Sequence, residues 1–150
     1  MSTYFAKVSW RREGDFLKGQ YSRLHAIAFD GGIEVPGSAS RHNVPAPYAV
    51  EAAVDPEELF VASLSTCHML WFLDYAKRAG IVVEAYEDAA EGVMAKDADG
   101  KVAITVVTLR PVVTLADPGL AGELATLHHK AHDACFIANS VKSEVRVEPV

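Results

Sequence analysis

Two residues could supply a thiol nucleophile, Cys67 and Cys135. They do not form a CxxC motif, so neither a thioredoxin-type redox pair nor a zinc knuckle is indicated. The N-terminus does not resemble a signal peptide, so we expect both thiols to be reduced. A reactive cysteine needs a cation, a base or a helix N-terminus nearby. Cys67 lies within an apolar stretch, and by periodicity alone it is better explained as a core residue.

The segment 128–135 is dense in potential metal ligands. His128 and His132 are four residues apart on one helix face, and Cys135 follows three residues later. That spacing could form half of a zinc site. Histidines on an exposed helix surface are the more ordinary explanation, because the spacing indicates no fourth ligand. A metal-binding protein therefore stays an alternative.

Glu57 is the candidate carboxylate. In the first turn of a helix it could simply favour the helix N-terminus, or it could orient an arginine beside a thiolate. Glu57 and Cys67 are ten residues apart, or ~15 Å along one helix. One side chain cannot bridge that gap. Two such helices crossing antiparallel at a dimer axis could place Glu57 of one chain near Cys67 of the other.

The helix that carries these residues has clear end signals. Asp55 suits the N-cap, Pro56 the first helical position and Glu58 the third, as in a capping box. The helix is predicted to run to Ala79, with Gly80 as the residue that ends it. Its middle is apolar nearly all round, which predicts burial on every side. A chain this small cannot easily wrap such a helix, so we expect a second subunit to cover part of it.

The remaining elements alternate between strands and a second helix. The order of strands, helix, strands, helix and strand predicts an α+β fold with an antiparallel sheet in one domain, residues 1–150. We expect strands at 4–10, 20–29, 81–94, 101–115 and 142–147, with a hairpin turn at 97–100 and the last strand at a sheet edge. We also expect an irregular loop at 33–54, a helix from Asp117 with apolar residues at helical spacing, and a short helical turn at 137–141.

Composition excludes several classes of partner. The net charge of −6 and the absence of a basic stripe argue against binding nucleic acid or an anionic membrane surface. The longest apolar stretch, 59–73, is short for a span of ~20 residues and better fits a buried helix. No GxGxxG or GxxxxGK sequence is present, so no phosphate-binding loop is indicated. We expect a cytoplasmic protein.

The sequence resembles the OsmC/Ohr family of peroxide-detoxifying proteins. The first matching segment, residues 55–68, fits a pattern of Asn or Asp, then Pro-Glu-x-Leu, then small residues before a cysteine. The second is His132 to Cys135 with Asn139, and the likeness in length and strand order spans nearly the whole chain. The resemblance implies an OsmC-like fold, with antiparallel sheets around a long buried central helix. It also implies an intertwined homodimer with two sites at the interface.

The resemblance further implies a thiol-dependent hydroperoxide reductase that needs no metal or organic cofactor. Cys67 would attack the peroxide and Cys135 would resolve the sulfenic acid as a disulfide. Glu57 would position a catalytic arginine, either Arg41, which is slightly favoured, or Arg23. An external dithiol, which in the family can be a lipoylated protein, would restore both thiols. The apolar helix favours organic hydroperoxides as substrates.

Two positions differ from the family pattern. Phe136 follows the second cysteine where the family usually has proline, and His68 follows the first, where it could act as a nearby cation or proton donor. One alternative to peroxidase activity is a non-catalytic protein of the same fold that binds an apolar small molecule at the interface. The other is the metal-binding protein built on His128, His132, Cys135 and Cys67.

Overall fold

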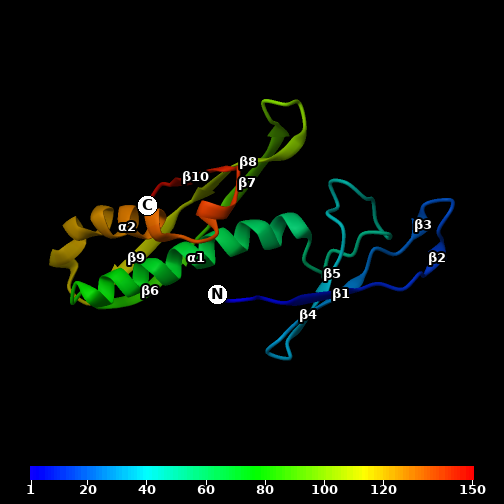
Figure 1. Ribbon diagram of the computed structural model, residues 1–150. Coiled ribbons are helices and arrows are strands. Elements are labelled where there is room, and N and C mark those ends of the chain that lie inside the picture. Colours follow the sequence, from blue (N-terminus) through cyan, green and yellow to red (C-terminus); the bar gives the residue numbers. More distant parts are fainter. The chain divides into compact units, whose positions relative to one another are not determined.

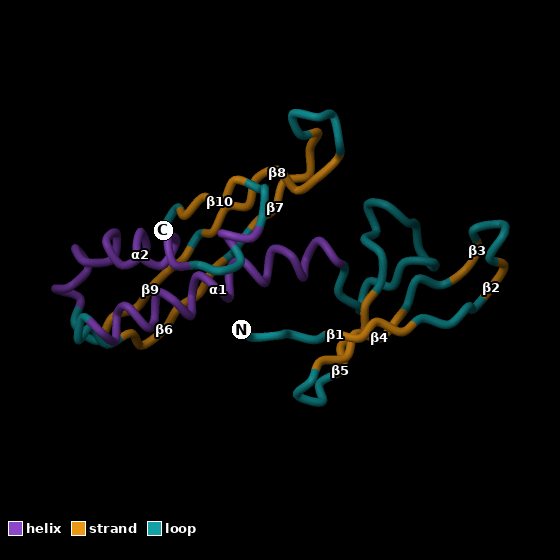
Figure 2. The backbone as a smooth tube through the Cα atoms, in the orientation of Figure 1, coloured by secondary structure: helices purple, strands orange, loops and turns teal.

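A computed structural model describes all residues 1–150 (Figures 1 and 2). The chain forms two compact units, Met1–Leu59 and Phe60–Val150. The single domain over 1–150 stays a prediction.

A small antiparallel sheet forms the N-terminal unit. Its strands are β1 (Ala6–Ser9), β4 (His25–Phe29) and β5 (Glu34–Gly37), in the order β1-β4-β5. Between β1 and β4 lies a ribbon of β2 (Gly14–Asp15) and β3 (Gln20–Tyr21). The strand predicted at 20–29 is therefore two strands, and β5 lies in a region predicted to be irregular. Proline is tolerated in β5 because β5 is an edge strand.

The N-terminal unit buries few apolar side chains. Ile27 and Ala49 are its only buried hydrophobic residues, beside Ser38 and Ser40. All four residues of β1 are exposed. Large apolar side chains of this unit are instead open to solvent: Tyr4, Phe5, Val8, Trp10, Phe16, Leu17, Leu24, Phe29 and Ile33. A sheet of this kind lacks a core of its own within the single chain.

The long helix α1 (Pro56–Arg78) has both predicted end signals. The Glu58 amide donates to Asp55 Oδ1 at 2.8 Å and the Asp55 amide donates to Glu58 Oε2 at 3.0 Å, which is a capping box. At the other end Gly80 has a φ of 71°, and the Ile81 amide donates to the Ala76 carbonyl at 2.9 Å. This is the Schellman arrangement that glycine permits.

Within the single chain α1 is buried along one side only, and the expected cover of its other sides by a second subunit stays a prediction. Its buried residues form one stripe at a spacing of four: Leu64, His68, Phe72 and Ala76. Leu70, on another side, is 58% exposed. The apolar content of the other faces therefore has no cover within the chain. The length and apolar composition of α1 would allow it to cross a membrane. The core helix of a soluble protein can have the same length and composition.

The C-terminal unit contains two further sheets. β6 (Val83–Asp88) pairs antiparallel with β9 (Pro111–Leu115). The other sheet has the order β10-β8-β7, with β7 (Glu91–Lys96) and β8 (Val102–Leu109) joined by the predicted turn at 97–100.

The last strand, β10 (Glu144–Val147), is an edge strand as predicted, but it pairs parallel to β8, so the sheets are not all antiparallel. Between β8 and β10 the chain passes through β9 and a helix, and such a crossover lets a strand return in the same direction.

The second helical region is made of three pieces. The helix predicted from Asp117 begins as the 3-10 helix η1 (Pro118–Glu123) and continues as α2 (Leu124–Ala134). The Asp117 carboxylate caps η1 by accepting from the Gly119 amide at 2.9 Å. The short turn predicted near 137–141 is η2 (Ala138–Ser140).

The buried stripe of α1 joins two apolar clusters of the C-terminal unit. Phe72 and Ala76 pack in one cluster, and Leu64 packs in the other. Their buried partners come from the strands and from α2: Ile81, Leu115, Leu127 and Ala131 in the first cluster, Val107 and Leu109 in the second. The packing of the buried stripe of α1 against α2 and the strands fixes the residues between these clusters, Cys67 and His68.

Candidate active site

The structure brings the two cysteines together. Cys67 lies in the middle of α1 and Cys135 directly follows α2, and the Cys67 thiol lies close enough to raise the pKa of Cys135. Both are free thiols; Cys67 is half-buried, whereas Cys135 is 1% exposed. Two thiols in contact can form a disulfide with little movement of the backbone.

The end of α2 holds Cys135 in a defined position. Its amide donates to the His132 carbonyl at 3.2 Å, and its carbonyl accepts from the Asn139 amide at 3.0 Å. The Asn139 side chain donates to the Asp133 carbonyl at 3.1 Å, which ties the segment after Cys135 back to the helix. The asparagine of the second sequence motif therefore has a structural role beside the thiol.

Cys135 is a poor thiolate in this environment. Burial raises its pKa to about 11, and contact with Cys67 acts in the same direction. The Ala138 amide, which donates to Cys135 Sγ at 3.4 Å, opposes the shift only in part. Cys135 is therefore a neutral thiol at neutral pH.

Aromatic side chains lie next to the cysteines. Trp71 is one turn after Cys67 on the same side of α1, and Phe136 directly follows Cys135. The two rings pack edge to face, with centroids 5.2 Å apart. Phe136 itself is 64% exposed. Phe136, which stands where the family usually has proline, thus adds an apolar ring beside the thiols.

His68 points into the protein interior. It is 1% exposed, and its Nε2 lies 3.0 Å from Nδ1 of His128, which is 3% exposed. The rings stack with an interplanar angle of 7°. Burial, followed by the neighbouring His128, lowers the pKa of His68 to about 4. The prediction that His68 could act as a cation beside Cys67 is therefore wrong, because the ring is neutral at neutral pH.

The histidine pair was not predicted from the sequence. An exposed helix surface is the more ordinary explanation of His128 from the sequence, yet its ring packs against Phe72, with ring centroids 4.4 Å apart. Burial lowers the pKa of His128 to about 4 as well. The available signal was periodicity. His68 falls four residues after Leu64 and four before Phe72, so it belongs to the buried stripe of α1.

The histidines and cysteines do not form a metal site. No group of three or more His, Cys, Asp or Glu side chains is arranged to hold a metal ion. The half zinc site suggested by His128, His132 and Cys135 is not assembled, since Cys135 contacts Cys67 and His128 contacts His68. The metal-binding alternative has no geometric support in this chain.

The other candidate residues belong to the N-terminal unit. Arg41 forms an ion pair with Glu51 at 2.6 Å, and both side chains are exposed. Arg23 donates to the carbonyls of Gly19 and Tyr21 and lies over the Tyr21 ring, 3.6 Å from its centroid.

Glu57, in the first turn of α1, has its Oε2 atom buried without a hydrogen-bond partner. A buried carboxylate oxygen of this kind is costly unless a donor reaches it. Within the single chain, Glu57 Oε2 therefore lacks the hydrogen-bond donor that its burial requires.

Comparison with known proteins assigns the family. A family model described as OsmC-like protein matches residues 49–150, which include both cysteines and all of α1. The chain belongs to the OsmC-like family. A search of curated proteins finds no match.

Solved structures of OsmC-like proteins share this fold over the whole chain. An OsmC-like protein of unknown function from Vibrio cholerae is 48% identical, with all of both chains covered and a TM-score of 0.96. The organic hydroperoxide resistance protein OsmC of Legionella pneumophila is 20% identical, with 99% and 96% of the chains covered and a TM-score of 0.69. The organic hydroperoxide resistance protein OhrB of Bacillus subtilis is 24% identical, with 98% of both chains covered and a TM-score of 0.64.

Proposed function

We propose that this OsmC-like protein is a cytoplasmic thiol-dependent peroxidase that reduces organic hydroperoxides in defence against oxidative stress. The observation that carries the proposal is the contact between the Cys67 thiol, in the middle of α1, and the Cys135 thiol, directly after α2. The names of the Legionella and Bacillus proteins of the same fold refer to organic hydroperoxide resistance, which supports the same chemistry.

The reaction balances with the two thiols alone. The Cys67 thiolate attacks the outer oxygen of ROOH, the O–O bond breaks, and the alkoxide takes up a proton to leave as ROH. Cys67 becomes a sulfenic acid. The Cys135 thiol then attacks its sulfur, and a disulfide and water form. An external dithiol reduces the disulfide by exchange and is itself oxidised to a disulfide.

The environments of the thiols favour this division of roles. Cys67 is half-buried, so a peroxide can reach it, whereas Cys135 is 1% exposed and its pKa is raised by burial. A nucleophile toward ROOH has to be an accessible thiolate. Cys135 meets neither condition but lies where it can capture a sulfenic acid on Cys67.

The substrate is proposed to be an organic hydroperoxide rather than hydrogen peroxide. The Trp71 and Phe136 rings provide an apolar surface next to the cysteines. An alkyl or aryl group buried against them gains roughly 25 cal/mol for each Å² of apolar area removed from water. Hydrogen peroxide has no group that could use that surface.

Glu57 is proposed to hold the catalytic arginine. Its partnerless buried oxygen requires a donor, and a guanidinium would satisfy it. Arg41 is the first choice, because its exposed ion pair with Glu51 is worth at most ~1 kcal/mol and can be exchanged for a better partner. Arg23 would have to give up two carbonyl contacts and a ring contact.

A homodimer is proposed as the functional form. The apolar residues exposed on the N-terminal unit and on α1 are of the kind that a second copy would cover. The helix-crossing arrangement expected from the sequence would then bring Glu57 of one chain to Cys67 of the other. Sedimentation equilibrium tests this, and a protein that stays monomeric at high concentration would contradict it.

The decisive experiment is a thiol count before and after one equivalent of cumene hydroperoxide. We expect both thiols to disappear, and peptide mapping to find Cys67 linked to Cys135 within one chain. If both thiols survive in the folded protein, the peroxidase proposal fails for this substrate. The non-catalytic ligand-binding alternative would then be the better account of the fold.

Matched variants separate the two thiol roles. In Cys135→Ser the peroxide should still oxidise Cys67, which a sulfenic acid reagent such as dimedone would trap, but no disulfide should form. In Cys67→Ser the Cys135 thiol should remain unoxidised. The dithiol requirement is tested by turnover with dihydrolipoamide and with glutathione; we expect turnover with the dithiol and little with the monothiol.

A further inference from the structure

The two cysteines differ in how far solvent can reach their sulfur atoms. Cys67 is half-buried, whereas Cys135 is 1% exposed. Because the thiols already lie next to each other, a disulfide between them needs little movement of the backbone, and each sulfur keeps its own surroundings. In the oxidised protein, a reductant from solution therefore meets one accessible sulfur and one buried sulfur.

The cover over Cys135 belongs to the core of the C-terminal unit. The segment after Cys135 turns back toward it, and the Ala138 amide donates to Cys135 Sγ at 3.4 Å. Ile137 and Ala138 pack against the buried cluster that contains Leu64. An attack on Cys135 Sγ would therefore require this segment to move away from the core first.

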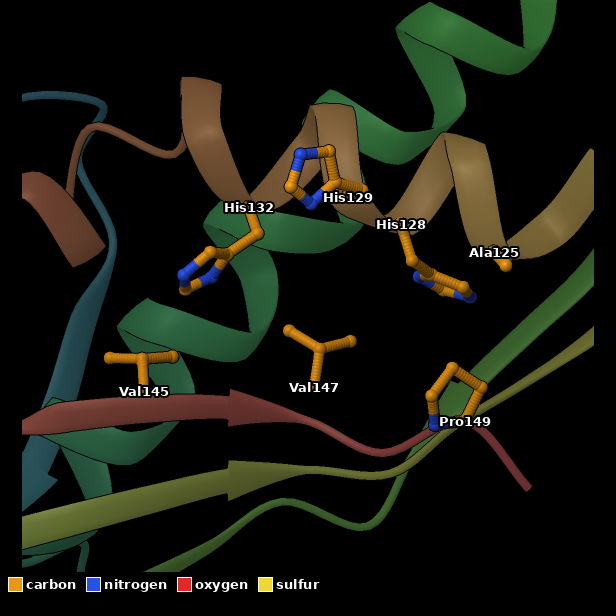
Figure 3. Close-up of a pocket in the computed structure, with 7 residues that line it drawn as sticks. All are labelled: Ala125, His128, His129, His132, Val145, Val147 and Pro149. Atoms are coloured by element: carbon orange, nitrogen blue, oxygen red, sulfur yellow. The ribbon is translucent and has the colours of Figure 1, made fainter.

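The pocket beside α2 does not open a way to Cys135. Figure 3 shows this pocket between α2 and β10, with the side chains of His128, His129 and His132 carried by α2. His132 is the last α2 residue that lines it, and neither cysteine is part of the lining. Because Cys135 is 1% exposed, a thiol in this pocket would still be separated from Cys135 Sγ by protein atoms.

Thiol–disulfide exchange also depends on which sulfur leaves. Attack at Cys67 makes Cys135 the leaving group, and burial raises the pKa of Cys135 from 9.0 to about 11. Even if the rate followed the leaving-group pKa fully, this shift would slow departure by about a hundredfold. An opened core segment is rarer, with a population on the order of one molecule in a thousand or less. Access therefore outweighs the leaving group and favours attack at Cys67.

We propose that the external dithiol attacks Cys67 Sγ of the disulfide, so that the mixed disulfide forms on Cys67 and Cys135 is the leaving thiol. This proposal rests on the proposed peroxidase function, whose product is that disulfide. The S–S bond breaks, its electron pair passes to Cys135 Sγ, and Cys135 takes up a proton. The second thiol of the reductant then attacks the reductant's own sulfur, which releases Cys67 as a thiolate and leaves the dithiol oxidised to a disulfide.

Cys67 thus reacts with both external molecules of the cycle, the peroxide and the reductant, whereas Cys135 bonds only to Cys67. A monothiol stops at the mixed disulfide, because a second molecule is needed to release Cys67. Return attack by Cys135 is slow, since its raised pKa keeps it a neutral thiol. The mixed disulfide with a monothiol should therefore accumulate on Cys67, where it can be mapped.

The test forms the disulfide with diamide, which oxidises two thiols without a peroxide. The oxidised protein is treated briefly with excess glutathione near neutral pH, quenched with acid, and mapped after alkylation in denaturant. We expect glutathione on Cys67 at least about tenfold more often than on Cys135. In guanidinium chloride, where both sulfurs are accessible, the two cysteines should be modified about equally.

Matched variants test the cover over Cys135. Ile137 and Val145 both pack against the cluster around Leu64, but only Ile137 lies in the segment that covers Cys135. Ile137→Ala should raise the share of glutathione on Cys135 by at least about fivefold, because the loosened segment opens more often. Val145→Ala should leave that share as in the wild type.

Three results would overturn the proposal. They are glutathione on Cys135 as often as on Cys67 in the folded protein, the same distribution in the folded and the unfolded protein, and an unchanged distribution in Ile137→Ala. A protein in which diamide links no Cys67 to Cys135 would overturn it as well. If diamide forms the disulfide and a peroxide does not, the proposed function fails, whereas the site of reductant attack is still decided by the glutathione map.

Discussion

The two units of the chain differ in how completely they bury their own apolar residues. In the C-terminal unit, Leu64, Phe72 and Val107 are 0% exposed and belong to two packed clusters. In the N-terminal unit only Ile27 and Ala49 are buried hydrophobics, while Phe5 is 68% and Ile33 65% exposed. Within the single chain, the larger apolar core therefore belongs to the C-terminal unit.

This difference separates the parts of the proposed reaction. The two thiols and the histidine pair lie inside the well-packed unit, where their environment is fixed by the chain itself. The proposed arginine and Glu57 lie in the unit with little core, where Glu57 has an oxygen without a partner. The thiol chemistry should therefore survive changes that disturb the N-terminal unit, whereas the acceleration supplied by the arginine should not.

The largest expected effect comes from the nucleophile. Cys67→Ser should lower peroxide consumption by about a thousandfold or more, since a hydroxyl cannot replace the thiolate. Arg41→Ala should lower the rate less while leaving disulfide formation intact, because the thiols stay in contact. Consumption of cumene hydroperoxide with a dithiol reductant measures both. Equal rates for Cys67→Ser and wild type would exclude Cys67 as the nucleophile and so overturn the proposed division of roles between the two thiols.

Core packing should show the same contrast in stability. Phe72→Ala removes a fully buried ring and should cost about 3–5 kcal/mol of unfolding free energy. Phe5→Ala, at an exposed position, should cost under about 0.5 kcal/mol in the monomer.

Urea denaturation at several protein concentrations checks both values. If Phe5 is covered by a second copy, its variant should lose more stability at high concentration than at low. A large loss for Phe5→Ala that does not depend on concentration would show that the N-terminal unit has a core of its own.

The buried histidines should make the C-terminal unit sensitive to acid. Burial lowers the pKa of His68 and of His128 from 6.5 to about 4, so between these values the unfolded chain binds more protons than the folded one. Stability is therefore complete above about pH 6.5 and is lost as the pH falls toward 4, by about 3 kcal/mol for one such histidine. Because the pair is coupled, the two losses should not simply add.

Comparison with a double variant isolates this effect from the carboxylates. His68→Leu combined with His128→Leu removes both rings together, so no buried nitrogen is left without its partner within the pair. Its unfolding free energy should fall less between pH 6.5 and 4 than that of the wild type. Parallel pH profiles for the two proteins would contradict the assignment of the acid sensitivity to the histidines.

Much of the fold could be predicted because its signals are local. The capping box at Asp55 and Glu58, the glycine that ends α1 and the turn at 97–100 all act within a few residues, and all are present. The helix at α2 was found from its apolar spacing. The parallel pairing of β10 was missed, since which neighbour a strand pairs with depends on the path of the chain and not on the strand's own sequence.

The site was harder to predict because it depends on distant contacts. The proximity of Cys67 and Cys135 is implied only by the family resemblance, because no sequence spacing relates residues of two separate elements. The burial of His68 and His128 could not be predicted for the same reason, since a polar residue is buried only where a partner such as the facing imidazole forms a hydrogen bond with it. The predicted burial of α1 on all sides rests on composition. Composition cannot distinguish a helix face that is buried by its own chain from one that is buried by a second copy.

The smallest expected effect concerns the helix that runs through both units. Asp55→Ala removes the side chain that accepts from the Glu58 amide and should cost about 1 kcal/mol, whereas Asp55→Asn keeps an acceptor and should cost much less. Because the lost cap loosens the first turn, which carries Glu57, peroxide turnover should fall more in Asp55→Ala than in Asp55→Asn, while the rate of Cys67–Cys135 disulfide formation from a preformed sulfenic acid stays the same. The unfolding free energy, the rate of peroxide turnover and the rate of disulfide formation should be measured for both variants. If the rate of disulfide formation fell by the same factor as peroxide turnover, the start of α1 and the thiols would behave as one cooperative element. The contrast between a self-contained C-terminal unit and an incomplete N-terminal unit would then have to be withdrawn.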